Sequence, residues 1–425
     1  MLKVAAGSLA ASIVALLFNF ASSILYARLL GPEMRGEFGG IVFTVTLISS
    51  LSQFGFGQSY IYCRRKVYAT SGMLAFLTIS IVVITMVSLG MTAAFHVVDY
   101  DGPNIIVYLA AVTSAMLLFF TDISRLQPGL VVYNLKQITL STGTVVLILV
   151  CLFFGDHFTT FTAVSIFFSS MLLTSVVVTP FVWKNEVNKK PFDTNIDWRY
   201  IYSYGLKSYG TSITGLLVNN FDRIFLLYMG GSLNFGIYIV AYNTSRLIGI
   251  IPQTLSNVIF ARYAGVDEQG LAKTTGRVFS LLFIPMMMLA LVVSLAGTFL
   301  IPVLFGSDFS GAIIPFGILI FECVISGLGW ILAQRFAASG RPGLVFFRQL
   351  VSIFPLFLLF VYLPPYNIGI VLALMLLVAT TIRFLLTIFM FPAVYNEPIP
   401  SLLPQRNDIA MLVNFARRRV FGSRR

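Results

Sequence analysis

The sequence predicts an all-α integral membrane protein in which two similar groups of helices follow each other along the chain. Of its 425 residues, 58% are hydrophobic and only 10% are charged, and the mean hydropathy is +0.90. A soluble fold of this length cannot remove so much apolar surface from water. Apolar segments of about 20 residues recur instead, which is the length that a helix needs to cross a bilayer.

About twelve of these segments are expected to be transmembrane helices, six on each side of the longest polar connection, residues 183–199. The expected spans are residues 7–27, 38–62, 73–95, 104–122, 137–154, 161–183, 200–228, 236–260, 278–302, 311–333, 344–362 and 368–391. An even number of spans per half gives both halves the same orientation, as in parallel repeats. The expected organisation is a six-helix lobe at 1–183, a cytoplasmic linker at 184–199, a second six-helix lobe at 200–391 and a basic cytoplasmic tail at 392–425.

An internal repeat relates the two halves. Residues 8–53 align with residues 208–253 without a gap, and 13 positions are identical. Composition alone does not explain the matched polar residues, because polar groups inside a bilayer are costly. The matched polar and glycine pairs include Asn19/Asn219, Gln53/Gln253, Gly31/Gly231 and Gly36/Gly236. Membrane proteins of two similar halves usually bind substrate between them and rock one half against the other. The repeat therefore predicts transport rather than catalysis.

The net charge of +12 follows membrane topology. With the N-terminus inside, Lys and Arg concentrate in the cytoplasmic loops and the tail, as the positive-inside rule requires. The opposite loops are short and mostly acidic, with Asp99, Asp101, Asp156 and Asp308. We expect a multi-pass protein of the inner (plasma) membrane with both termini cytoplasmic and no nucleic-acid partner. The cysteines Cys63, Cys151 and Cys323 lack metal or redox spacing, so no metal site and no cofactor are expected.

Polar side chains form stripes along the expected spans, since helical residues advance about 100° each. They are candidates for the lining of a wet substrate cavity. The alternative is that they only hold helices together, which is the more common role of Ser and Thr. The candidate cavity residues are Asn19, Gln53, Asn219, Arg223, Asn243, Arg246, Gln253, Asn257 and Arg383.

Charged residues at the bilayer centre cost about 2.5–3.5 kcal/mol each on insertion scales, so they usually mark function. Asp222 and Glu322 are the only carboxylates deep in the expected spans and are the candidates for proton or sodium coupling. A buried structural pair is an equally good explanation, and Asp222 could pair with Arg246. The deep bases outnumber the deep acids, which favours an anionic substrate.

Several segments resemble one family in order along the chain. Residues 27–32 and 36–38 resemble the end of the first span in polysaccharide flippases of the Wzx (O-antigen flippase) type. These flippases belong to the multidrug/oligosaccharidyl-lipid/polysaccharide exporter (MOP) superfamily. The second half resembles them at residues 221–223, 236–242, 304–309 and 338–342. The resemblance covers residues 5–391.

This resemblance implies a MATE-like fold with two parallel six-helix lobes around a central cavity. It implies a flippase that moves a polyprenyl-pyrophosphate-linked oligosaccharide from the cytoplasmic to the periplasmic leaflet for polysaccharide biosynthesis, by alternating access and with H⁺ or Na⁺ coupling. Basic side chains would meet the pyrophosphate and polar ones the sugar hydroxyls. Membrane lipids and a glycan polymerase or co-polymerase are the other partners that the resemblance implies.

Two other functions are alternatives to the flippase interpretation. A cation-coupled multidrug antiporter of the same fold would prefer an acidic, aromatic-lined cavity, whereas the stripes here are net basic. A membrane enzyme needs catalytic groups, yet His96 and His157 both lie at loops and the sequence contains neither a Walker A nor an HExxH motif. We therefore expect that the protein is not an enzyme.

Overall fold

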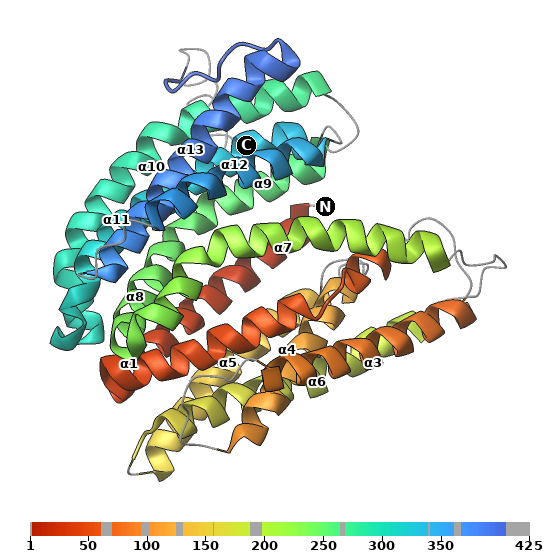
Figure 1. Ribbon diagram of the computed structural model, residues 1–425, viewed down its shortest axis with the longest axis vertical. Coiled ribbons are helices and arrows are strands. Elements are labelled where there is room, and N and C mark those ends of the chain that lie inside the picture. Colours follow the sequence, from red (N-terminus) through yellow and green to blue (C-terminus); the bar gives the residue numbers. More distant parts are fainter. Residues whose placement is uncertain are drawn as a thin grey trace, which may run out of the picture. The chain divides into compact units, whose positions relative to one another are not determined.

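The computed structural model describes residues 2–60, 70–94, 103–124, 131–155, 157–187, 198–263, 268–338, 341–360 and 367–404. Within these ranges the regular structure is helical, without a strand (Figure 1). The helices are α1 (Leu2–Leu51), α3 (Thr70–Ala94), α4 (Asn104–Ser124), α5 (Val131–Phe154), α6 (Thr160–Val187), α7 (Trp198–Met229), α8 (Gly231–Ser245), η2 (Arg246–Gly249), α9 (Ile250–Tyr263), α10 (Glu268–Phe305), η3 (Ser307–Ala312), α11 (Ile313–Ala338), α12 (Pro342–Phe360) and α13 (Ile368–Tyr395).

These helices confirm the predicted all-α membrane fold. Eight of the described helices are long and apolar enough to cross a membrane. Each of the twelve expected spans falls wholly or mainly on helix, because α1 bends sharply and supplies two spans, and α8, η2 and α9 together supply one. The protein is therefore a multi-pass membrane protein.

The internal repeat is visible in the backbone. Gly31 interrupts α1 with φ 67°, and Gly231 separates α7 from α8 with φ 70°. Both values lie in the left-handed region, which glycine adopts without the steric penalty of a Cβ. Pro32 then begins the second half of α1, where its missing N–H costs nothing. The two equivalent glycines thus make the same turn at the same point of each half.

The described chain divides into two compact units. The first unit contains residues 1–217, 227–239 and 304–308, and the second contains residues 218–226, 240–303 and 309–425. The predicted lobe boundaries at 183 and 200 stay a prediction, and most of the expected linker lies outside the described residues.

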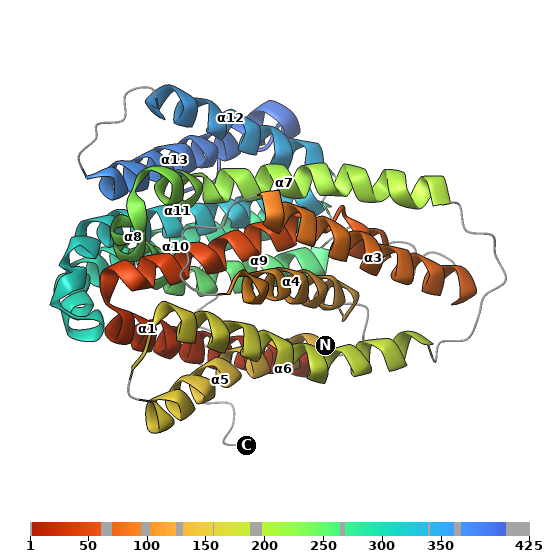
Figure 2. The same ribbon diagram turned by 60° about the horizontal axis from the view of Figure 1, so that its bottom comes forward.

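In the first unit, α1 packs along α5 and α4, while α6 packs on both of these (Figure 2). Two apolar clusters fill the space between the helices, one around Tyr26, Phe38 and Ile41 and the other around Phe76 and Phe119. Several hydroxyls inside this unit donate to carbonyls one turn earlier, as Ser49 Oγ does to the carbonyl of Val45 at 2.6 Å. Such bonds let polar side chains sit between helices without water.

In the second unit, α11 is the central helix and packs against α13, α9 and α12 (Figure 1). Its apolar residues, among them Leu319, Val324 and Leu328, are buried. Phe279 of α10 and Phe384 of α13 lie with their ring centroids 5.9 Å apart. This unit differs from the first in holding several charged side chains deep in its interior, and these define the site.

Candidate functional site

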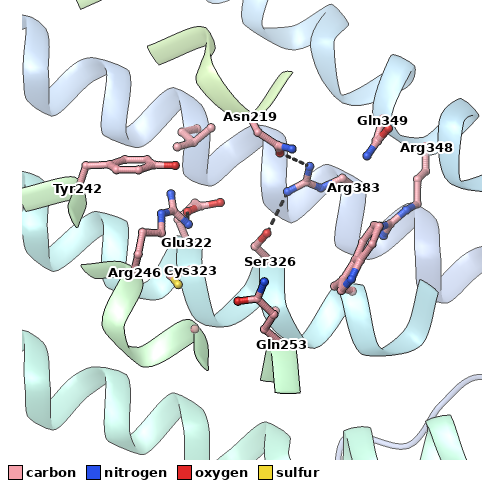
Figure 3. A pocket seen from close by; sticks show the side chains of 14 residues that line it. Asn219, Tyr242, Arg246, Gln253, Glu322, Cys323, Ser326, Arg348, Gln349 and Arg383 are labelled. Atoms are coloured by element: carbon pink, nitrogen blue, oxygen red, sulfur yellow. Dashed lines mark hydrogen bonds and ion pairs between the residues drawn. The ribbon is translucent and has the colours of Figure 1, made fainter. Parts of the chain in front are cut away.

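A cavity of about 360 Å³ lies inside the second unit. Its walls come from α7, the α8–η2–α9 segment, α11, α12 and α13. Figure 3 shows its polar side chains converging from these helices. The lining residues are Asn219, Tyr242, Arg246, Gly249, Gln253, Glu322, Cys323, Ser326, Gly327, Trp330, Arg348, Gln349, Leu376 and Arg383.

The shortest charged contact of the cavity joins Arg246 to Glu322. Nη1 of Arg246 lies 2.6 Å from Oε2 of Glu322, and the Glu322 side chain is 3% exposed. The other carboxylate oxygen accepts a hydrogen bond of 2.8 Å from Oγ1 of Thr380. Arg246 begins η2, so the short 3₁₀ segment sets the direction of its side chain toward α11. From the sequence, Asp222 was a possible partner of Arg246, whereas the ion pair at 2.6 Å is formed with Glu322. Asp222 is buried in the same unit.

Arg383 on α13 connects three helices across the cavity (Figure 3). Its Nη1 donates to Oδ1 of Asn219 at 3.2 Å, and its Nη2 donates to Oγ of Ser326 at 3.1 Å. These partners are neutral. These dipoles solvate the charge of Arg383, and a bound anion would add a formal negative charge at hydrogen-bond distance.

Arg348 on α12 is the most enclosed of the three lining arginines, at 2% exposed. Its Nη1 donates to Oγ1 of Thr387 at 2.9 Å and to the carbonyl of Gly329 at 3.4 Å. Its guanidinium carbon lies 5.4 Å from the ring centroid of Trp330. Its Nε has no hydrogen-bond partner among the described residues. A buried guanidinium with neutral partners is expensive to maintain, which points to a functional role.

Tyr242 links the cavity to Arg223. The guanidinium carbons of Arg223 and Arg246 lie 4.0 Å and 4.3 Å from the centroid of the Tyr242 ring. Nη2 of Arg223 also donates to the Tyr242 hydroxyl at 3.0 Å and to Oδ1 of Asn220. The aromatic face stabilises two like charges that would otherwise repel each other.

The lining side chains have a positive balance. Arg246, Arg348 and Arg383 are opposed by the single carboxylate of Glu322. Hydrogen-bonding groups of Asn219, Gln253, Ser326 and Gln349 share the walls with the indole of Trp330. This combination suits a ligand that carries both an anionic group and neutral hydroxyls.

Five of the predicted site residues meet in this cavity: Asn219, Arg246, Gln253, Glu322 and Arg383. Arg223 and Asp222 lie nearby in the same unit. Asn243 has an exposed side chain and does not line the cavity, and the side chain of Asn257 lies outside the described part of the structure. The roles assigned to all of these residues stay predictions.

The two predicted residues of the first half have other surroundings. Asn19 is exposed. Gln53 is buried, and its Nε2 donates at 3.0 Å to the carbonyls of both Ser49 and Ala115, so it ties α1 to α4. The repeat therefore conserves the amide while the two halves place it differently.

Sequence reasoning missed Arg348 and Tyr242 as members of the site. Arg348 was visible as a charge within an expected span, which is the signal that identified the other arginines. Its place near the end of that span concealed its depth. No sequence pattern marked Tyr242, Trp330 and Cys323 as cavity-lining residues, because aromatic and thiol side chains are common throughout apolar helices.

Comparison with solved structures identifies the fold. The chain superposes on the lipid II flippase MurJ in an inward closed conformation with a TM-score of 0.68, at 11% identity, covering 95% of this chain and 91% of that one. An inward-facing multidrug resistance MATE transporter of the MOP superfamily gives a TM-score of 0.64 at 19% identity, covering 90% and 96%. A mutant of the Vibrio cholerae MATE transporter VcmN gives 0.57 at 13% identity, covering 93% and 97%. No curated protein sequence matches the chain.

The membrane-spanning helices are arranged in the fold that MurJ and the MATE transporters share. The sequence pattern of the polysaccharide biosynthesis protein family matches residues 2–265. The chain belongs to this family, and the resemblance to polysaccharide flippases is confirmed at the level of family and fold.

Proposed function

We propose that this protein is a flippase for lipid-linked oligosaccharides. It moves a polyprenyl-pyrophosphate-linked glycan from the cytoplasmic to the periplasmic leaflet of the inner membrane, by alternating access. The observation that carries the proposal is the cavity of the second unit, where three arginines face one carboxylate among neutral hydrogen-bonding groups. Family membership and the MurJ-like fold support the same conclusion.

The arginines would receive the pyrophosphate. Guanidinium groups bind phosphate oxygens through paired, charge-assisted hydrogen bonds. Arg383 is the best placed, since its present partners are the neutral side chains of Asn219 and Ser326. The pyrophosphate would replace these dipoles by full negative charge. Gln253 and Gln349 then supply amide groups for sugar hydroxyls.

Glu322 would couple transport to an ion. It is the carboxylate of the cavity, and it is held by Arg246 at 2.6 Å and by Thr380 at 2.8 Å. An anionic substrate competes with this carboxylate for Arg246. A carboxylate displaced from its guanidinium in a buried site favours binding of H⁺ or Na⁺, which links substrate occupancy to ion occupancy.

The same residues argue against the cation-coupled multidrug antiporter that shares this fold. A cationic drug entering this cavity would meet three guanidinium groups. Repulsion between like charges at close range costs roughly several kcal/mol in a low-dielectric site. The chain is proposed to carry out no covalent chemistry. The cavity lining contains one carboxylate and therefore lacks the pair of carboxylates that glycoside hydrolysis uses. Among the described residues, no group of three His, Cys, Asp or Glu side chains could hold a metal ion.

The test is transport by purified protein in sealed vesicles. A labelled polyprenyl-pyrophosphate oligosaccharide starts in one leaflet, and its arrival in the other is timed with and without a proton or sodium gradient. We expect protein-dependent movement that a gradient accelerates. Efflux of a cationic dye, beside immobile lipid-linked glycan of several sugar compositions, would support the multidrug antiporter instead.

A further inference from the structure

A second cavity lies in the second unit, apart from the candidate substrate site. It measures about 480 Å³ and is formed by the first turns of α10 and the segment that follows α13. Its walls are Ala272, Lys273, Gly276, Arg277, Ser280, Phe391, Glu397, Pro398, Ile399, Pro400 and Ser401. None of these residues lines the first cavity.

The charged side chains of this second cavity give it a positive balance. Lys273 and Arg277 are one helical turn apart on α10, so both cations lie along the same wall. The carboxylate in the lining, Glu397, is already paired with Arg335, whose Nη2 lies 2.8 Å from Oε1. Arg335 also stacks on the ring of Tyr395 at 4.0 Å. Arg335, which is outside the cavity lining, therefore neutralises the carboxylate of Glu397, and the charge of the lining remains net positive.

The serine hydroxyls of the walls are arranged as acceptors. Oγ of Ser280 donates to the carbonyl of Arg277 at 3.0 Å. Oγ of Ser401 donates to the carbonyl of Leu403 at 2.7 Å and accepts from the backbone N–H of Leu403 at 3.2 Å, which leaves it one lone pair. Each hydroxyl has one proton, so its remaining capacity is to accept. A ligand that donates hydroxyl protons fits these groups better than one that only accepts.

The segment after α13 continues from the cavity wall at Ile399 into exposed apolar residues, here called the apolar rim. Ile399, Leu402 and Leu403 belong to the same short segment and have exposed side chains. Exposed apolar side chains beside basic groups, at the end of a membrane-spanning helix, are expected at the lipid interface. The basic residues place this end on the cytoplasmic side by the positive-inside rule.

We propose that this cavity binds the headgroup of an anionic phospholipid that carries free hydroxyls, such as phosphatidylglycerol. Lys273 and Arg277 hold the phosphate, Ser280 and Ser401 accept from the headgroup hydroxyls, and the acyl chains lie along the apolar rim. This site shares no residue with the substrate cavity, so the proposal of lipid binding does not depend on the proposed transport function.

Gly276 provides a test that leaves every charge in place. It lies between Lys273 and Arg277, and no atom lies within 4 Å of the position that its Cβ would occupy. The side chain of Gly276→Leu therefore starts in open space at its Cβ, and we expect it to occupy part of the cavity. Lys273→Ala combined with Arg277→Ala removes the charges. The matched control is Lys184→Ala with Arg199→Ala, which removes two exposed cations elsewhere.

The measurement is native mass spectrometry of the full chain released from vesicles of phosphatidylglycerol, phosphatidic acid or phosphatidylcholine. We expect one retained phosphatidylglycerol, weaker retention of phosphatidic acid and none of phosphatidylcholine. G276L and the Lys273/Arg277 double variant should each lower retention at least tenfold, and the control should not. Ser280→Ala should reduce the preference for phosphatidylglycerol over phosphatidic acid.

Two results would overturn the proposal. Equal retention of phosphatidylglycerol by wild type and G276L would show that the lipid binds elsewhere. If millimolar free glycerol phosphate displaces the lipid, the site would be assigned to a soluble phosphate compound. Circular dichroism of each variant distinguishes loss of lipid from loss of fold.

Discussion

Gly36 and Gly236, which occupy equivalent positions in the two copies of the sequence repeat, pack backbone against backbone. A Cβ on Gly36 would lie 2.9 Å from the nitrogen of Gly236, and a Cβ on Gly236 would lie 2.8 Å from the nitrogen of Gly36. Each would also run into a carbonyl of the other segment, that of Ser232 or that of Pro32. The contact is reciprocal, as expected at a local two-fold axis between equivalent elements.

This contact predicts that Gly36→Ala and Gly236→Ala each destabilise the first unit. The obstacle is backbone, which cannot move aside as the end of a side chain can, so we expect a loss of about 1–3 kcal/mol for each. Thermal unfolding in detergent measures the effect. Gly143→Ala in α5 is the control, because a Cβ there meets nothing within 4 Å. Unchanged melting of both glycine variants would show that the close approach is absent.

The ion pair of Arg246 and Glu322 predicts strong non-additivity. Arg246→Gln leaves the buried carboxylate of Glu322 without its partner, which typically costs about 3–5 kcal/mol. Glu322→Gln leaves the guanidinium of Arg246, which is 29% exposed, and should cost less. The double variant removes both charges and should recover much of the loss. A double-mutant cycle of unfolding midpoints checks this. Additive losses would mean that the two side chains do not interact in the folded protein.

The positive cavity predicts charge-selective labelling of Cys323, whose thiol belongs to the lining. In a chain carrying Cys63→Ser and Cys151→Ser, an anionic methanethiosulfonate should react faster than a cationic one of similar size. Electrostatic focusing in clefts changes rates by about 10-fold or more. Rates are read from the mass of the modified protein. Preference for the cationic reagent would contradict the charge balance assigned to this cavity.

The arginines predict a graded loss of transport. Arg383→Ala and Arg348→Ala should each lower the initial flipping rate at least tenfold, because each removes a guanidinium from the proposed pyrophosphate site. Arg383→Lys should retain part of the activity, since it keeps the charge and loses the paired geometry. Membrane abundance of each variant is measured in parallel. Wild-type rates at normal abundance would remove these residues from the site.

Much of the fold could be predicted from the sequence, because apolar length and repeat are direct consequences of the bilayer. The length of about 20 residues per apolar segment gave the expected spans, and the sequence repeat predicted equivalent elements in the two halves. The exchange of short segments between the compact units could not be predicted, since it depends on contacts far apart in the chain.

The candidate site was predicted in part. Buried charge is costly wherever it occurs, so Arg246, Glu322 and Arg383 stood out from their apolar neighbours. Which carboxylate meets which arginine depends on helix rotation and on the 3₁₀ segment at 246–249, neither of which a periodicity argument resolves. The different settings of Gln53 and Gln253 show the same limit.

The most direct test compares two substrates in one vesicle assay. A glycan linked through pyrophosphate to a polyprenol is timed against the same glycan linked through a neutral group, with wild type and with the variant Arg348→Ala/Arg383→Ala. We expect the wild-type protein to flip the pyrophosphate form much faster and the variant to lose this preference. Equal rates for both substrates with the wild-type protein would contradict recognition of the anionic group by this cavity.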